Sequence, residues 1–133
     1  QEPLILVASK DHTLAPNKYV TPDMLEKEHL ILTQKGSKYR ALFDKYLSNH
    51  NIYINSCSEF ESVEAIKHFV LNNLGISFMP YSIVEKELNN GSLIKIPIED
   101  TEFCIPAQVL YHNKKWMSPA LRSLLDLTYK TIK

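Results

Sequence analysis

Apolar and polar positions along the chain follow two periods, one typical of strands and the other of helices. Strand-sized runs of apolar or alternating residues occur at 4–9, 29–33, 52–56, 75–80, 93–97 and 107–112. Helical spacing, with apolar residues three or four positions apart, occurs over about 38–49, from 63 to 74, and from 119 onwards. Strands that alternate with helices over short connections predict an α/β fold with largely parallel strand pairing.

Polar residues that favour helix ends flank these segments. Thr21 before Pro22 predicts the start of a short helix, and Ser62 is expected to cap the helix that follows it. Ser82 and Glu85 have the spacing of a capping box, which predicts another short helix there. Each of these helices therefore has a local signal for where it starts.

Composition places the chain among ordinary globular proteins. It has 133 residues, of which 44% are hydrophobic and 23% charged, enough to bury a core and too apolar for a disordered chain. Lys and Arg number 15, as do Asp and Glu, so the formal net charge is zero. A domain that binds DNA by itself usually carries a basic excess, and no apolar run approaches the roughly 20 residues that span a bilayer. The sequence therefore predicts a chain that neither binds nucleic acid alone nor crosses a membrane.

Residues that could carry catalysis or bind a metal are sparse and scattered. The three glycines are too few for a phosphate-binding loop, and the five histidines have no partner histidine at helical spacing. The two cysteines, Cys57 and Cys104, are too few for a disulfide framework, and free thiols in a reducing cytosol are favoured over a single bridge. Cys57 has no recognisable base beside it. We therefore expect no catalytic residue, no metal site and no cofactor.

Two strand-to-helix turns offer a different chemistry. In 34–37 (QKGS) and 57–62 (CSEFES), hydroxyl-bearing residues come directly before a helix, where free backbone N–H groups and the helix dipole attract anions. Each turn can also be explained without a ligand, since Ser37 and Ser62 can simply cap their helices. Two such turns side by side at the carboxyl ends of parallel strands would form one edge of a binding crevice.

Short motifs follow one another along nearly the whole chain. They are EPLILV at 2–7, DHTLA at 11–15, GSKYR at 36–40, EAIK at 64–67, GISFMP at 75–80, LNNGSL at 88–93 and SPA at 118–120. Together they resemble the effector-binding domain of LysR-type transcriptional regulators, and in particular the second half of that domain. Thr13 stands where that family usually has proline. Asn73 replaces a glycine and Met79 a leucine, changes that keep a residue able to adopt the left-handed conformation and a buried apolar one.

This resemblance implies that residues 1–133 are part of one type 2 periplasmic-binding-protein-like domain, in which two lobes hold a small molecule between them. Residues 8–82 would form the second lobe, and residues 1–7 and 83–133 the crossover and first-lobe elements. The ligand-facing positions would then be those of the two turns: Gly36, Ser37, Ser58, Phe60 and Ser62. Hydroxyls and helix starts suit a small anion, most simply a carboxylate.

The function implied is that of a sensory and dimerisation domain, in which a small-molecule effector alters how the parent regulator sits on DNA. The parent would be a cytoplasmic homodimer or tetramer that contacts DNA only through a helix-turn-helix domain, for which this chain has no counterpart. No enzyme activity is expected. An alternative with the same two-lobed architecture is a periplasmic solute-binding protein of a transporter. The order of the motifs and the use of cysteine favour the regulator.

Overall fold

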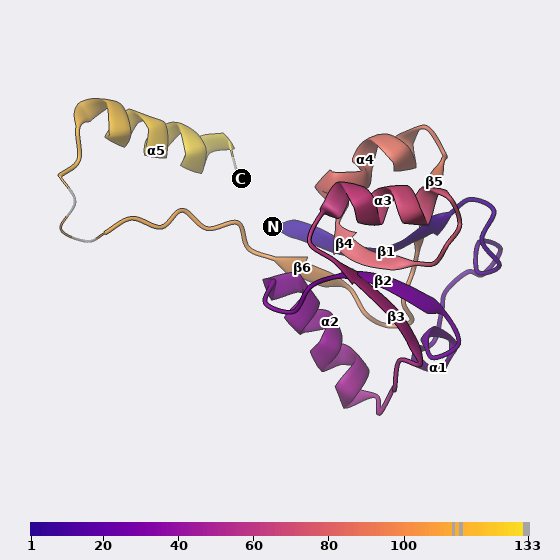
Figure 1. The fold of residues 1–133 in the computed structure, drawn as a ribbon. Coiled ribbons are helices and arrows are strands. Elements are labelled where there is room, and N and C mark those ends of the chain that lie inside the picture. The colour runs from indigo at the N-terminus through magenta and orange to yellow at the C-terminus, as the bar shows by residue number, and fades with distance from the viewer. Residues whose placement is uncertain (113, 115, 132–133) are drawn as a thin grey trace.

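The computed structural model describes residues 1–112, 114 and 116–131 as a mixed α/β body with a C-terminal segment that leaves it (Figure 1). The strands are β1 (Glu2–Ser9), β2 (His29–Thr33), β3 (Ser56–Phe60), β4 (Ser77–Pro80), β5 (Leu93–Ile96) and β6 (Phe103–Ile105). The helices are α1 (Pro22–Leu25), α2 (Lys38–Asn49), α3 (Val63–Leu71), α4 (Tyr81–Asn89) and α5 (Pro119–Thr131). Among these described residues, no helix combines the length and the apolar character that crossing a membrane requires.

β1 is the central strand of the body. It pairs with β4 along one edge and with β5 and β6 along the other, in every case antiparallel. β2 and β3 pair in parallel, and a parallel bridge between Leu30 and Ile76 joins them to the segment that leads into β4. The prediction of largely parallel pairing is therefore wrong for every pair that contains β1.

The direction of β1 explains this error. Because β4 and β5 are both antiparallel to β1, they run parallel to each other, as strands joined by a helix usually do. β1 lies between them with the opposite direction. Local periodicity gives the type of each element and carries no information on which strand will be inserted between two others.

The apolar run of β1 is buried on both faces of the sheet. From Leu4 to Ala8, alternate side chains belong to two separate cores. One core contains Phe43 of α2, whose ring stacks on Phe78 of β4 with centroids 4.5 Å apart. The other contains Ile66 of α3 and Val84 of α4. The sheet is thus covered by α2 on one face and by α3 and α4 on the other (Figure 1).

The strand expected at 52–56 is displaced along the chain. Ile52 is buried and Ile54 packs against the core, but both lie in an irregular segment, and β3 begins only at Ser56. β3 is an edge strand that pairs with β2, so its residues are mostly polar and exposed. The apolar alternation at 52–56 therefore reflects a buried segment that precedes the strand. Most of the turn expected at 57–62 is part of β3.

Four smaller expectations also need correction. No strand forms at 107–112, because the described residues contain no partner strand for it. α4 begins before Ser82, whose N–H donates to the carboxylate of Glu2, so Ser82 and Glu85 do not form the expected capping box. Leu74 lies beyond the end of α3 and is 56% exposed. Thr21 precedes α1, but its side chain makes no capping hydrogen bond.

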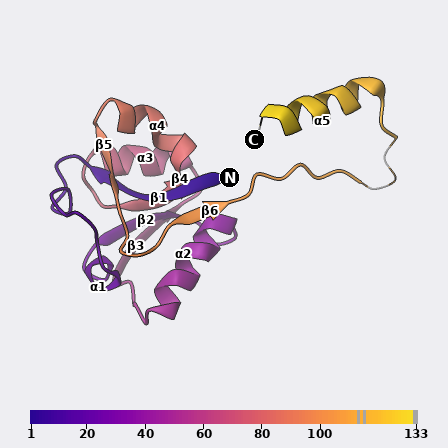
Figure 2. The same cartoon turned by 180° about the vertical axis from the view of Figure 1, so that it is seen from behind.

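After β6 the chain leaves the body, and α5 lies away from both sheets (Figure 2). Within 119–131, no side chain of α5 is buried, and Leu124 and Leu127 are exposed. Glu2 pairs with Ile105, so the start of β1 and the end of β6 lie at the same edge of the sheet. This is also the edge where β2 and β3 end, because β1 runs in the opposite direction to them.

Candidate functional site

The candidate site is the edge of the sheet where β2 and β3 end and α2 and α3 begin. Thr33 at the end of β2 is in register with Phe60 at the end of β3. The two turns that follow are neighbours, and the N–H of Gln34 donates to the carbonyl of Phe60 over 3.3 Å. α2 and α3 then lie on opposite faces of the sheet (Figure 1). The two helix starts are therefore adjacent, which is the arrangement that one edge of a binding crevice would require.

Gly36 and Ser37 form the first turn. Gly36 has a φ of 120°, a conformation that favours glycine. The hydroxyl of Ser37 accepts the N–H of Arg40 over 3.2 Å and so caps α2. It also lies 3.2 Å from the hydroxyl of Thr33. Each hydroxyl has one donor and two acceptor sites, so this pair retains hydrogen-bonding capacity beyond the cap.

Ser62 and Phe60 mark the second turn. The exposed Ser62 caps α3, since its hydroxyl accepts the N–H of Ala65 over 3.2 Å. Phe60 is half-buried, and its ring stacks on that of Phe69 with centroids 4.7 Å apart. Ser62 is therefore at the edge, whereas the ring of Phe60 is directed towards α3.

Ser58 lies further back, in the middle of β3. Its hydroxyl is 3.0 Å from Nε2 of His29, and Nδ1 of the same ring is hydrogen-bonded to Ser56. The side chain of Ser58 thus has an internal partner. Of the expected ligand-facing residues, the structure brings Gly36, Ser37 and Ser62 to the edge and places Ser58 and Phe60 behind it.

A buried charge that sequence reasoning missed lies behind the first turn. The Arg40 side chain is only 8% exposed. Its guanidinium donates to the carbonyl of Thr33 over 2.6 Å, to Asp44 over 2.8 Å and to Glu59 over 2.9 Å. Burial acts to lower the pKa of Arg40, but the hydrogen bonds and charges of Asp44 and Glu59 outweigh it and raise that pKa above its ordinary value. The guanidinium therefore remains charged.

A sequence signal for Arg40 existed in the GSKYR motif. Arg40 follows the capping Ser37 by three residues, so it lies in the first turn of α2, close to the end of β2. Glu59 gave no such signal, because its approach to Arg40 depends on the register of β3 beside β2.

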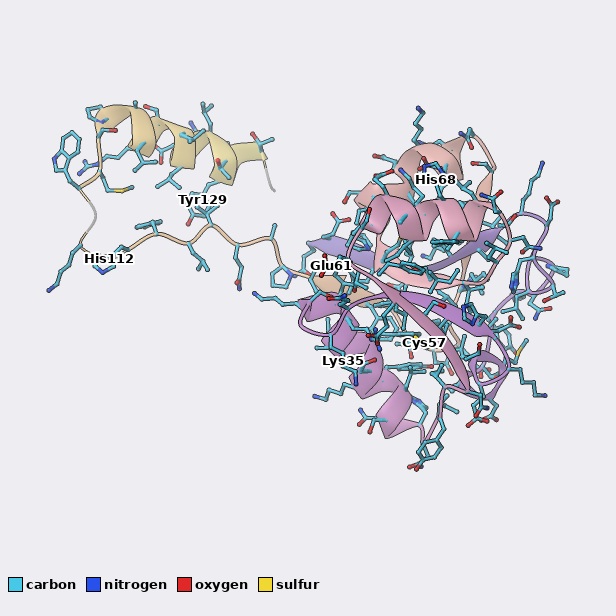
Figure 3. All side chains as sticks on the ribbon, viewed as in Figure 1. Lys35, Cys57, Glu61, His68, His112 and Tyr129 are labelled. Carbon is cyan, nitrogen blue, oxygen red and sulfur yellow. The ribbon has the colours of Figure 1, made fainter. Side chains whose placement is uncertain are left out.

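The two cysteines are free and exposed. Figure 3 shows Cys57 and Lys35 on the side of the body that carries α2. Partial burial raises the pKa of the Cys57 thiol; the charges of Arg40 and Lys35 oppose this shift, and those of Glu59 and Asp44 reinforce it. A thiol with a raised pKa is mostly protonated at neutral pH and is a poor nucleophile. Over the described ranges, no three His, Cys, Asp or Glu side chains are grouped closely enough to hold a metal ion.

Two cavities lie beside the sheet, and the second of them reaches Lys35 of the first turn and Arg40 behind it. One of about 500 Å³ is lined by the first half of β1 and by residues between 95 and 103. The other, of about 420 Å³, lies between α2 and residues 51–54. Neither is lined by Gly36, Ser37 or Ser62. These three residues therefore lie outside both cavities, and burial of a ligand against them requires a second wall.

This architecture is that of a type 2 periplasmic-binding-protein-like domain. Residues 1–131 match the LysR substrate binding domain family, and the chain belongs to that family. The resemblance deduced from the motifs is thus confirmed.

Relatives and solved structures agree with this family. The uncharacterized HTH-type transcriptional regulator YwqM of Bacillus subtilis (strain 168) is 36% identical over 133 residues, which is all of this chain and 45% of that protein. The regulatory domain of CcmR from Synechocystis PCC6803, solved with 2-PG, has a TM-score of 0.82 at 23% identity over 99% of this chain and 64% of that one. The effector binding domain of QuiR, solved with shikimate, has a TM-score of 0.72 at 19% identity over 98% of this chain and 61% of that one.

The chain therefore spans less than half the length of YwqM. Relatives of this chain are named as helix-turn-helix regulators, so the comparisons do not favour the alternative of a transport solute-binding protein.

Proposed function

We propose that this chain is the effector-sensing and dimerisation part of a bacterial LysR-type transcriptional regulator. The observation that carries the proposal is the pair of adjacent helix starts at one edge of a lobe from this family. Their free N–H groups and hydroxyls suit a small anion, and a carboxylate is the simplest such group. Gly36, Ser37 and Ser62 contact the effector, while Ser58 and Phe60 support the second turn from behind.

The path of the chain supports a position for the first lobe above this edge. Glu2 at the start of β1 and Ile105 at the end of β6 both lie there, so the chain enters and leaves the body beside the two helix starts. The resemblance assigns residues 8–82 to the second lobe and residues 1–7 and 83–133 to the crossover and first-lobe elements. Because β5 pairs with β1 in the same sheet, we propose instead that the second lobe extends to about residue 97.

The same proposal accounts for the position of α5 away from the body. Leu124 and Leu127 are exposed, as a helix that packs against first-lobe residues elsewhere in the protein would require. The structure of CcmR matches 99% of this chain, and the match covers 64% of the CcmR chain, so about a third of that chain lies outside the matched part. Closure of the two lobes on the effector then shifts the population of domain arrangements.

At the level of the whole protein, the regulator is a cytoplasmic homodimer or tetramer. It reaches DNA through a helix-turn-helix domain outside this chain, since the formal net charge of zero gives this chain no excess of positive charge for phosphate. We expect no enzyme activity, because relatives are named as transcriptional regulators and the Cys57 thiol, whose pKa is raised, is a poor nucleophile.

The experiment is a thermal-shift screen of the whole protein with small carboxylic acids, each paired with its primary amide. A bound effector raises the melting temperature by mass action. We expect at least one acid to stabilise the protein while its amide does not. Equal stabilisation by acid and amide would contradict an anion site, and the absence of any stabilising acid would contradict the carboxylate class.

A further inference from the structure

We propose that Arg40 is a positioning residue of the effector site, which holds the two helix starts at a fixed separation. The inference rests on the proposed function, because that proposal assigns the effector to these turns. Arg40 itself is buried behind the first turn, so it acts through the groups that it binds.

The contacts of the guanidinium define the link. Nη1 donates over 2.6 Å to the carbonyl of Thr33, the last residue of β2 before the first turn. Nη2 pairs over 2.9 Å with Glu59, which lies in β3 directly before the end of that strand. One rigid group therefore joins the strand ends that lead into both turns. The planar fork of arginine can hold both partners at once, which the single ammonium of lysine cannot do with the same geometry.

The third partner gives a matched control. Asp44 receives a hydrogen bond from Nε over 2.8 Å, but it lies on α2 itself, four residues after Arg40. Its contact with Arg40 therefore stays inside one helix and does not reach β3. Asp44 and Glu59 have side chains 41% and 38% exposed, so replacement of either by alanine leaves no large cavity in a core.

Apart from the parallel ladder of β2 and β3, one long backbone bond links the two turns. The backbone bond from Gln34 to Phe60 is long, at 3.3 Å between N and O. The hydroxyl pair of Thr33 and Ser37 and the cap at Ser62 each lie within one turn. The parallel ladder ends at Thr33 and Phe60, so beyond it the salt bridge to Glu59 and this backbone bond link the strand ends that lead into the turns.

The test compares Glu59→Ala with Asp44→Ala in the whole protein. Both variants remove one negative charge and one partner of Arg40, so charge and loss of an ion pair are matched. Amide hydrogen exchange is measured in 34–38 and 60–63 without effector. We expect Glu59→Ala to accelerate exchange in both segments by about fivefold, the effect of losing roughly 1 kcal/mol of local stability. Asp44→Ala should leave exchange in 60–63 within about twofold of the wild type.

Equal acceleration of exchange in 60–63 by the two variants, or none by Glu59→Ala, would overturn the proposal. A merely structural role of Arg40 would lower the melting temperature in both variants without separating them in this way. Arg40→Lys is the second variant: it keeps the charge and loses the fork, and we expect the exchange pattern of Glu59→Ala. Because no effector is needed, a failed carboxylate screen would count against the proposed function and leave this result standing.

Discussion

The ring of Phe60 stacks on the ring of Phe69, with centroids 4.7 Å apart and planes inclined by 24°. Phe60 is the last residue of β3 and Phe69 lies on α3, so the stacked pair packs the helix against the strand that precedes it. Both side chains are half-buried and pack against the smaller core that contains Ile66 and Val70. The aromatic residue of the second turn is therefore engaged in packing.

Replacement of Phe60 by alanine should lower the stability of the body. The variant loses a half-buried aromatic side chain and its stacking interaction, which should lower the free energy of unfolding by about 2 kcal/mol. Urea unfolding of the variant measures this loss, and Phe69→Ala should give a similar value because it removes the other half of the pair. A Phe60→Ala variant with unchanged unfolding and weakened effector binding would instead show that its ring contacts the ligand.

Gly75 should tolerate no side chain. A Cβ at this position would lie 2.4 Å from the carbonyl oxygen of His29, which is backbone and cannot easily move aside. Gly36 has nothing within 4 Å of its Cβ position, so Gly36→Ala incurs only the strain of its positive φ. We expect Gly75→Ala to lower the free energy of unfolding, measured by thermal unfolding, by roughly 2–3 kcal/mol, and Gly36→Ala to lower it by about 1 kcal/mol. Equal losses would mean that the contact with His29 does not restrict Gly75.

The ion pair between Lys67 and Glu87 should make stability depend on acid pH. It joins α3 to α4 with 3.2 Å between Nζ and Oε1, and both side chains are largely buried. Burial acts to raise the pKa of Glu87, but a backbone hydrogen bond and Lys67 outweigh it and lower that pKa below its ordinary value of 4.5.

The sign of the effect follows from this direction. A carboxyl with a lowered pKa in the folded state stabilises that state above pH 4.5, and the contribution is lost as the pH falls through the folded-state pKa. Glu87→Gln cannot titrate, so the difference in unfolding free energy between wild type and variant should be widest at neutral pH and narrower at an acid pH below 4.5. Urea unfolding at the two pH values measures this difference. A difference independent of pH would contradict the assigned shift.

The exposed face of α5 should matter only where a first lobe covers it. Leu124 is 59% exposed, so Leu124→Asp should not change the unfolding of residues 1–133 on their own. In the whole protein the same change places a charge in the proposed contact and should cost about 2 kcal/mol or more. Ser123→Asp, on the same helix, is the control and should be neutral in both. If Leu124→Asp leaves the whole protein unchanged, α5 does not pack as proposed.

Prediction from sequence succeeded where burial alone decides the structure. The expected strand at 29–33 and the expected helix at 38–49 coincide with β2 and α2, because their apolar spacing reflects the faces that they bury. It failed for β3, whose polar residues carry little apolar signal at the edge of the sheet, and for the direction of β1, which depends on distant segments.

The same division applies to the candidate site. Ser37 and Ser62 could be recognised because a helix cap is a local feature of a few residues. The link between Arg40 and Glu59 could not, since it exists only when β3 lies in register beside β2. The internal partners of Ser58 and Phe60 likewise come from other elements, His29 of β2 and Phe69 of α3.

The central claim, that an anion binds at the start of α2, is tested most directly by comparing Ser37→Asn with Ser37→Asp. Both residues cap a helix as well as serine does, so both variants should keep the fold, but only aspartate places a negative charge at the site. The measurement is calorimetric titration of the whole protein with a carboxylate that stabilises the wild type. We predict that Ser37→Asn binds within a few-fold of the wild type and that Ser37→Asp loses at least about tenfold in affinity. Equal affinities for the two variants would contradict an anion site at this turn.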